Sequence, residues 1–299
     1  MVEQPVFDFS KESNVARMPG WIRQAFGRDD YAQTTRALSS HALNTVCVEA
    51  RCPNRGECWS RGTATFMLLG DTCTRACGFC AVKTGKPHHL DLDEPRRVAE
   101  ATQAMGLDYI VLTSVNRDDQ ADGGATIFAQ TIAALREKNP SIKLELLTPD
   151  FYRCQQSAVD IVLTQLRMLP GVPFLVWGHN IETVPSLYKR VRKGSDYQRS
   201  LTLLEQAAQH DEFETKSALM LGLGETRSEV ETVLKDLNRV GVKRIALGQY
   251  LRPTRFHLPV KEYITPEQFA DYEQMALQMG FSWVKAGPLV RSSYHAEDE

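Results

Sequence analysis

The sequence has no excess of charge of one sign and no long apolar run. Its 35 Lys and Arg residues nearly balance 37 Asp and Glu residues, which leaves a formal net charge of -2. A dedicated nucleic-acid binder normally carries a strong positive field, so we expect no nucleic-acid partner. No stretch reaches the roughly 18 uninterrupted apolar residues that a membrane helix needs, so we expect no membrane association.

The first residues also lack a targeting signal. Glu3, Asp8 and Glu12 stand where a secretory signal would carry basic and then apolar residues, and their acidity disfavours a transit peptide. Cysteine is absent after Cys154, and six of the 7 cysteines fall between positions 47 and 80. In a chain of this size without a signal, such clustering favours metal binding over a disulfide framework. The sequence therefore predicts a reducing, cytoplasmic location.

From about residue 64, short apolar strands alternate with helical patterns. Hydrophobic periodicity predicts helices over 94–105, 125–138 and 155–168, and one or two more within 185–209. Capping signatures at 226–229 and 265–268 begin two further helices. Strands are predicted at 65–69, 109–115, 142–147, 172–177 and 217–221, and from 244 onward. Six strand–helix units in series indicate a parallel sheet with right-handed connections.

Six units are fewer than the eight of a closed barrel, so the alternatives are an open doubly wound sheet and an incomplete barrel. In each, the site lies where the strands end and the following loops begin. We predict three parts: an N-terminal extension over 1–63, a main domain over 64–280 and a C-terminal tail over 281–299.

Cys73, Cys77 and Cys80 form a C-x3-C-x2-C triplet directly after the first strand of the alternating region. Three thiolates within eight residues, with Gly78 letting the chain curl, can surround one small inorganic core. Structural zinc usually takes four protein ligands, often as two separated pairs, and no fourth Cys or His is adjacent. An iron–sulfur cube with three protein ligands would leave one iron open for a substrate.

This triplet, in this position, resembles that of the radical S-adenosylmethionine (radical SAM) enzymes. The resemblance implies a partial (β/α)6 barrel whose three cysteines hold a [4Fe-4S] cluster. It also implies that the open iron chelates the amino and carboxylate groups of S-adenosylmethionine. One electron then cleaves the sulfonium, and the resulting 5′-deoxyadenosyl radical abstracts hydrogen from an unactivated C–H bond.

A second triplet, Cys47-x4-Cys52-x5-Cys58, precedes the first strand. From its spacing alone, the alternative is that some of these residues are buried structural thiols. Together with the first triplet and the segment RSSYHA at 291–296, it resembles the lipoyl synthase family. The resemblance implies an auxiliary [4Fe-4S] cluster held by the second triplet and Ser292. The implied fold is a partial (β/α)6 TIM-like barrel whose N-terminal and C-terminal extensions carry that cluster.

Further segments match the same family at the predicted strand ends. They include Thr113-Ser114-Val115 and His179-Asn180-Ile181-Glu182, from which the resemblance implies four candidate contacts of S-adenosylmethionine: Thr113, Ser114, Asn180 and Glu182. The chain departs from the family at Asn116, where Asp is expected, and over 154–166 and 177–178.

The resemblance implies the insertion of two sulfur atoms, at C6 and C8 of an octanoyl chain that is amide-linked to a lysine of a carrier protein. Each insertion uses one S-adenosylmethionine, and the auxiliary cluster is consumed as sulfur donor. The implied partners are octanoylated lipoyl carrier domains, in 2-oxoacid dehydrogenase E2 subunits and the glycine cleavage H protein. An electron donor such as ferredoxin or flavodoxin is also implied.

Three alternatives remain at this point. A radical SAM methylthiotransferase also carries two clusters, but it should show a basic RNA-binding module, which a net charge of -2 disfavours. A metal-binding protein without catalytic activity needs no substrate-sized barrel. A nucleotide loop at Gly222-Leu-Gly224 is disfavoured because Arg227 takes the place of the third glycine of G-x-G-x-x-G.

Overall fold

The computed structural model describes residues 18–23, 43–46, 54, 57–58, 63–171, 174–294 and 296 of the 299-residue chain. Cys47 and Cys52 lie outside the described residues. Within the described ranges, the main sheet has eight strands, in this spatial order: β1 (Asn44–Thr45), β2 (Thr63–Leu68), β5 (Tyr109–Ser114), β6 (Lys143–Leu147), β7 (Leu175–Gly178), β8 (Phe213–Leu221), β9 (Arg244–Gln249) and β10 (Trp283–Gly287). Strands β2 to β10 pair in parallel, and β1 pairs with β2 antiparallel.

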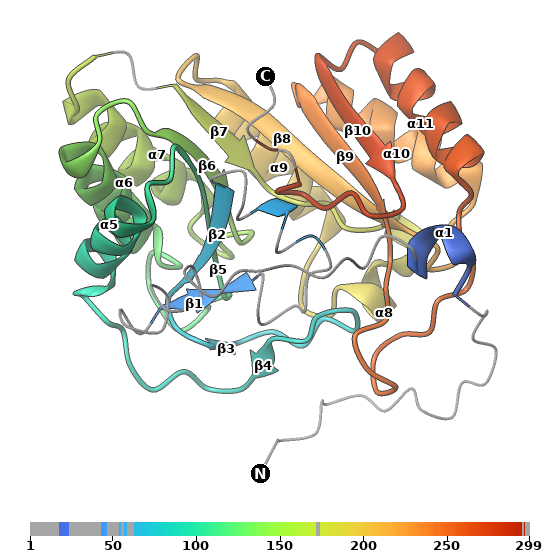
Figure 1. Cartoon of the computed structure of the whole chain (residues 1–299), viewed down its shortest axis with the longest axis horizontal. Helices are drawn as coiled ribbons and strands as arrows, with labels where there is room; N and C mark the ends of the chain where they lie inside the picture. The colour runs from blue at the N-terminus through green and yellow to red at the C-terminus, as the bar shows by residue number, and fades with distance from the viewer. Residues whose placement is uncertain are drawn as a thin grey trace.

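Helices cover the outer face of this sheet (Figure 1). They are α5 (Glu94–Met105), α6 (Ala125–Lys138), α7 (Gln155–Met168), α9 (Tyr197–Ala208), α10 (Arg227–Arg239) and α11 (Pro266–Gln278). The short helix α8 (Tyr188–Val191) lies at one end of the sheet instead (Figure 1). A separate helical turn, α1 (Gly20–Arg23), precedes the sheet. No helix among the described residues is both long and apolar enough to cross a bilayer.

The predicted alternation is confirmed. The helices predicted over 94–105, 125–138 and 155–168 have those bounds, and both capping boxes form, at Thr226 with Glu229 and at Thr265 with Gln268. Six strand–helix units run from β2 to α11, and the sheet stays open between β1 and β10. This architecture is the partial barrel, with an additional parallel strand, β10, inside the segment predicted as the tail.

Strand β8 is longer than predicted, because it begins at Phe213 rather than at residue 217. Its first half contains Glu214 and Lys216, whose charges hide the strand pattern in the sequence. In the structure these charges are paired: Arg244 of β9 donates to Glu214, and Lys216 donates to Glu145 of β6. Charged residues are compatible with the buried strand because neighbouring strands supply their partners.

The two faces of the sheet contact different parts of the chain. Ile110 and Leu112 of β5 belong to the hydrophobic cluster that packs under the helices. Tyr109 and Val111, which alternate with them, pack instead against Ala296 of the C-terminal tail. The tail therefore lies against the inner face of the partial barrel.

Close passage of the tail depends on a glycine in β9. Val290 packs with Ala218, Ala246 and Trp283 on the inner face. A Cβ atom built on Gly248 would lie 2.1 Å from the Val290 carbonyl oxygen. Only glycine leaves room for the backbone of the tail at this point.

A buried ion pair crosses the inner face. Lys216 Nζ lies 2.8 Å from Glu145 Oε2, and both side chains are 0% exposed. The Tyr109 hydroxyl donates to the same carboxylate oxygen at 3.1 Å, and the ammonium lies 4.7 Å from the centre of the Trp283 ring. Burial lowers the pKa of Lys216, and the Glu145 carboxylate opposes that shift. Each charge depends on the other because water does not reach either of them.

Replacing one member of this pair should therefore be costly. We expect Glu145→Ala to reduce the free energy of unfolding by about 3–5 kcal/mol, because it leaves the Lys216 ammonium buried without its partner. The double variant Glu145→Leu/Lys216→Met should recover most of the loss, since it removes both charges. Urea unfolding followed by circular dichroism measures both. A double variant no more stable than Glu145→Ala would contradict this account.

Candidate functional site: a cysteine loop at the carboxyl end of the sheet

The predicted C-x3-C-x2-C triplet lies at the carboxyl end of β2. We call residues 73–80 the cysteine loop. It begins in β3 (Thr72–Cys73), which pairs in parallel with β4 (Lys83–Thr84) to form a small second sheet. Figure 1 shows β3, β4 and α8 at one end of the main sheet, where the parallel strands end. This is the end at which α/β proteins bind their ligands.

Backbone hydrogen bonds fix the loop from two sides. The Gly78 N–H donates to the Val191 carbonyl of α8 at 2.9 Å, and the Leu258 N–H donates to the Gly78 carbonyl at 3.0 Å. A Cβ atom on Gly78 would lie 2.9 Å from Leu258 Cδ1 and 3.1 Å from the Arg190 carbonyl oxygen. Glycine is therefore needed here for close packing, in addition to the freedom to curl predicted from the sequence.

His257 holds the end of the loop. Its Nε2 lies 3.0 Å from the Cys80 carbonyl oxygen, and its Nδ1 lies 2.8 Å from the Thr254 hydroxyl. A carbonyl only accepts, so Nε2 carries the proton and Nδ1 accepts from Thr254. Burial lowers the pKa of His257, which keeps this neutral tautomer in place near pH 7.

Arg75, between the first two cysteines, ties the loop to the next two strand ends. Its guanidinium makes bidentate hydrogen bonds to Asp118, after β5, and to Asp150, after β6, at distances of 2.7 to 2.9 Å. Burial alone would lower the pKa of Arg75, but these bonds outweigh it and raise the pKa. Arg199 donates to Asp150 as well, at 2.8 Å. The buried Arg75, the partly exposed Arg199 and two carboxylates thus lock the loop onto the barrel.

The three thiols lie close enough for their charges to interact. Burial, with a smaller contribution from the neighbouring cysteines, raises the pKa of Cys77 to about 11 and that of Cys80 to about 12. Cys73 Sγ accepts hydrogen bonds from the backbone N–H groups of Arg75 at 3.4 Å and Asn116 at 3.3 Å. Thiolates at such a site need a strongly positive group to stabilise them, and N–H donors to sulfur are typical around iron–sulfur clusters. The residues present therefore fit a cluster.

Single-ion coordination fits less well. Among the described residues, no three His, Cys, Asp or Glu side chains converge on a point where one metal ion would bind. Four sulfur ligands of one zinc ion must all lie about 2.3 Å from it. Each cysteine of an iron–sulfur cube binds a different iron atom, so the thiols stand further apart.

The predicted contacts of S-adenosylmethionine lie at the same end of the sheet. The Thr113 hydroxyl donates to the Leu147 carbonyl at 2.8 Å, whereas the buried Ser114 hydroxyl has no partner among the described residues. Asn180 donates to Glu182 Oε1 at 3.1 Å. Burial raises the pKa of Glu182, and its backbone has a φ of +67°. A strained, buried carboxyl group close to the thiols is typical of a binding residue.

The Ser292 side chain also contacts one of these predicted residues, Asn180. Its hydroxyl donates to Asn180 Oδ1 at 2.9 Å, although the two residues are 112 positions apart. The described residues of the N-terminal extension contact the same tail: Asn54 donates to the Leu289 carbonyl at 2.6 Å, and the Tyr294 hydroxyl lies 3.3 Å from both oxygens of Glu57. The structure thus brings Ser292 to the Asn180–Glu182 pair, and Asn54 and Glu57 to the tail. Cys47 and Cys52 lie outside the described residues.

Two sequence features acquire physical explanations. Asn116 contacts the cysteine loop through its backbone N–H and carbonyl, which Asp would present equally well. The turn that begins at Gly222 is closed by Glu225, whose carboxylate accepts from the N–H groups of Gly222 and Leu223. Those donors are unavailable to a phosphate, which agrees with the rejection of a nucleotide loop.

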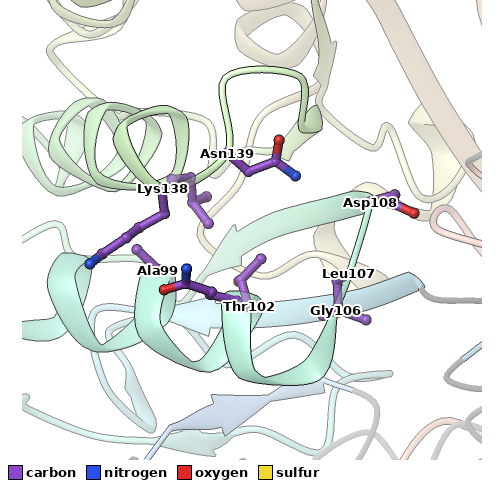
Figure 2. A pocket seen from close by; sticks show the side chains of 9 residues that line it. Ala99, Thr102, Gly106, Leu107, Asp108, Lys138 and Asn139 are labelled. Atoms are coloured by element: carbon purple, nitrogen blue, oxygen red, sulfur yellow. The ribbon is translucent and has the colours of Figure 1, made fainter.

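A surface pocket lies elsewhere, between α5 and α6 (Figure 2). It is lined by Ala99, Thr102, Gln103, Gly106, Leu107, Asp108, Leu135, Lys138 and Asn139. Asp108 precedes β5, so the pocket opens at the amino end of the strands, opposite the cysteine loop. It is therefore separate from the candidate site.

Sequence reasoning missed the Arg75–Asp118–Asp150 cluster as a functional group. A signal was present, because Asp118 and Asp150 each follow a predicted strand and Arg75 lies within the triplet. Which cation pairs with which carboxylate depends on three loops meeting in space.

Comparisons with known proteins identify the family of this chain. Residues 67–237 match the Radical SAM superfamily. The fold is similar to that of SuiB from Streptococcus suis, solved with its precursor peptide SuiA, with a TM-score of 0.55 at 12% identity. That match covers 85% of this chain and 52% of SuiB. The chain is thus a radical SAM protein built on a partial barrel.

Two curated relatives identify the family to which the chain belongs within the radical SAM superfamily. The chain is 50% identical over 283 residues to the lipoyl synthase of Coxiella burnetii, covering 94% of this chain and 88% of that protein. It is 49% identical over 287 residues to the lipoyl synthase of Chlorobaculum tepidum, and that match covers 95% of this chain and 96% of that protein. The chain belongs to the lipoyl synthase family, whose members are sulfur-inserting enzymes that use S-adenosylmethionine and [4Fe-4S] clusters. The methylthiotransferase and the metal-binding protein without catalytic activity are both disfavoured by these matches.

The contacts of Arg75 generate a test. Lysine is a point charge that cannot bridge two carboxylates by bidentate bonds. We expect Arg75→Lys to reduce the free energy of unfolding by at least about 1.5 kcal/mol, the contribution of one hydrogen bond to a charged group. It should also reduce the iron retained by the reconstituted protein.

The matched control is Arg96→Lys, because Arg96 pairs with Asp93 and Glu100 on the exposed face of α5. Its stability and iron content should match those of the wild type. Equal behaviour of the two variants would show that the buried contacts of Arg75 do not hold the loop.

Proposed function

We propose that Cys73, Cys77 and Cys80 hold the cluster that cleaves S-adenosylmethionine. Cys47, Cys52, Cys58 and Ser292 hold the auxiliary cluster, whose sulfide is the donor. The observation that carries this proposal is the hydrogen bond from Ser292 to Asn180, because it joins the C-terminal tail to the Asn180–Glu182 pair at the end of the sheet where the cysteine loop lies.

The cluster on the cysteine loop, when bound, supplies the electron that splits the sulfonium bond of S-adenosylmethionine. The chain's own residues position that reaction. Gly78 and Arg75 hold the loop against α8 and against the ends of β5 and β6. Ser114, Asn180 and Glu182 offer polar atoms at the same end of the sheet, where they would orient S-adenosylmethionine.

The octanoyl chain would lie between the two cysteine sets. A hydrogen-abstracting radical also reacts with solvent, so the site must exclude water. The tail lies against the inner face of the sheet, at Val290 and Ala296, and narrows the space available to water. We assign the roles of extension, barrel and tail to 1–63, 64–280 and 281–299.

The partners follow from this chemistry. The substrate is an octanoyl group on the lysine of a lipoyl carrier domain, as in 2-oxoacid dehydrogenase E2 subunits and the glycine cleavage H protein. Ferredoxin or flavodoxin supplies the electrons. A cytoplasmic location suits both clusters, because their thiolate ligands must remain reduced.

The two cysteine sets should behave differently when mutated. Cys73→Ala should abolish both 5′-deoxyadenosine and sulfur-containing product. Cys58→Ala should still form 5′-deoxyadenosine but no product, because only the sulfur source is lost. Each variant should hold about four irons instead of about eight per chain, as expected when one of two four-iron clusters is missing.

Mass spectrometry of an octanoyl-lysyl peptide and of the nucleoside, under anaerobic conditions with a chemical reductant, measures both outcomes. Circular dichroism and the absorbance of the remaining cluster exclude misfolding. A folded Cys58→Ala variant that forms product would reject the donor assignment.

Ser292 should be the weakest ligand, because an alkoxide is a harder donor than a thiolate toward iron–sulfur. We expect Ser292→Ala to keep about eight irons but to lower sulfur insertion by about 10–100-fold, the usual cost of removing a group that tunes a metal site. Ser293→Ala, one residue further on, is the matched control and should retain full turnover. Wild-type product formation by Ser292→Ala would remove Ser292 from the mechanism.

A further inference from the structure

The backbone carbonyls of the three cysteines in the cysteine loop are all hydrogen-bonded, but their donors differ in kind. The Cys73 carbonyl accepts from the Gly85 N–H at 2.9 Å, and the Cys77 carbonyl accepts from the Cys80 N–H at 3.2 Å. Both of these donors belong to the main chain. The Cys80 carbonyl accepts instead from a side chain, because His257 Nε2 lies 3.0 Å from it. Of the three carbonyls, this is the one whose partner depends on a side chain.

Hydrogen bonds within the turn at 252–257 fix the direction of the His257 ring. The Thr254 hydroxyl accepts from the Phe256 N–H at 3.3 Å and donates to His257 Nδ1 at 2.8 Å. The main chain of His257 is held as well: its N–H donates to the Thr254 carbonyl at 3.1 Å, and its carbonyl accepts from Arg252 Nε at 2.8 Å. The residue is only 7% exposed. Its Nε2–H is therefore held in one direction, in a place that water hardly reaches.

The Cys80 carbonyl lies close to the charge of the cluster that we propose for this loop. It is bonded to the same Cα atom as the side chain that ends in the Cys80 sulfur. A carbonyl oxygen carries a partial negative charge, which opposes the arrival of a further electron. A hydrogen-bond donor at that oxygen offsets this charge, and the offset is larger in a buried site because the local dielectric constant is low. Hydrogen bonds and burial around a cluster help to set its reduction potential.

We propose that His257 is a positioning residue that raises the reduction potential of the cluster on the cysteine loop, through its hydrogen bond to the Cys80 carbonyl. This inference rests on the proposed role of Cys73, Cys77 and Cys80. One electron passes from an external chemical reductant to the cluster, and no bond forms or breaks at His257. The imidazole keeps its Nε2 proton throughout, because it acts as a fixed dipole.

A matched pair of substitutions separates the N–H group from the bulk of the side chain. Glutamine can present an N–H to the Cys80 carbonyl, whereas methionine has a similar length and no donor. The measurement is a redox titration without S-adenosylmethionine, followed by the electron paramagnetic resonance signal of the reduced cluster. The parent is the reconstituted full-length chain with Cys58→Ala, so that only the cluster on the cysteine loop contributes to the signal.

In this parent, His257→Met should lower the ratio of reduced to oxidised cluster at a given applied potential by about 10-fold, which is about 59 mV for a one-electron couple. His257→Gln should titrate as the parent does. The matched control is Thr84→Val. The Thr84 hydroxyl donates to the Arg75 carbonyl at 3.0 Å, so this variant removes a side-chain donor from the same loop at a residue to which we assign no iron. It should also titrate as the parent does.

Equal potentials in His257→Met and His257→Gln would overturn the proposal, and so would an equal shift in Thr84→Val. A purely structural role for His257 predicts that His257→Met loses iron while the remaining clusters keep the potential of the parent, and this result would also overturn it. If circular dichroism shows that His257→Met is unfolded, His257→Asn replaces it, because its amide is one methylene shorter and falls short of the carbonyl.

Failure of the proposed function gives a different result. The titrated signal would then persist when Cys73→Ala is added to the parent, which would show that the cluster is not held by the cysteine loop. A signal that requires Cys73 but is indifferent to the N–H at position 257 would leave the proposed function intact and reject only the role of His257.

Discussion

The bidentate contacts of Arg75 are the constraint on which the site depends. Its guanidinium joins the loop after β2 to the carboxylates after β5 and β6, and Arg199 adds a contact from α9. Four elements that are distant in sequence are thereby fixed at one point. The cluster that we propose for this loop needs such rigidity, because small displacements of a reacting group cost much of the rate. The buried charges can be retained because every one of them is paired.

The inner face of the sheet serves a second purpose. It contains the Lys216–Glu145 ion pair and small residues such as Ala218 and Gly248, which leave room for the tail. Apolar packing under the helices stabilises the fold, while the inner face positions Ser292 beside Asn180. Because side chains alternate between the two faces of each strand, one face packs against the helices and stabilises the fold, while the other contacts the tail.

Much of this arrangement follows from local sequence rules. Periodicity predicted the helices α5, α6 and α7 with their observed bounds, because that signal lies within each helix. The start of β8 was missed, since Glu214 and Lys216 become compatible with a strand only through partners on β6 and β9. The strand β10, which pairs with β9 at the edge of the sheet, was missed as well. The cysteines were visible from spacing and resemblance. The contact of Ser292 with Asn180 was not, because it depends on how the tail folds back.

The position of the tail also orders events during synthesis. Residues 290–296 leave the ribosome after every strand of the sheet, and their place against Tyr109, Val111 and Trp283 exists only once those strands have assembled. N-terminal regions can begin to fold first, so the cysteine loop can take its shape while the tail is still absent. The contact of Ser292 with Asn180, and those of Asn54 and Glu57 with the tail, can form only afterwards. On the proposed assignment of the two clusters, a nascent chain would be able to load the cluster of the cysteine loop before the auxiliary cluster, and the machinery that delivers iron and sulfur would meet two different folding states of one polypeptide.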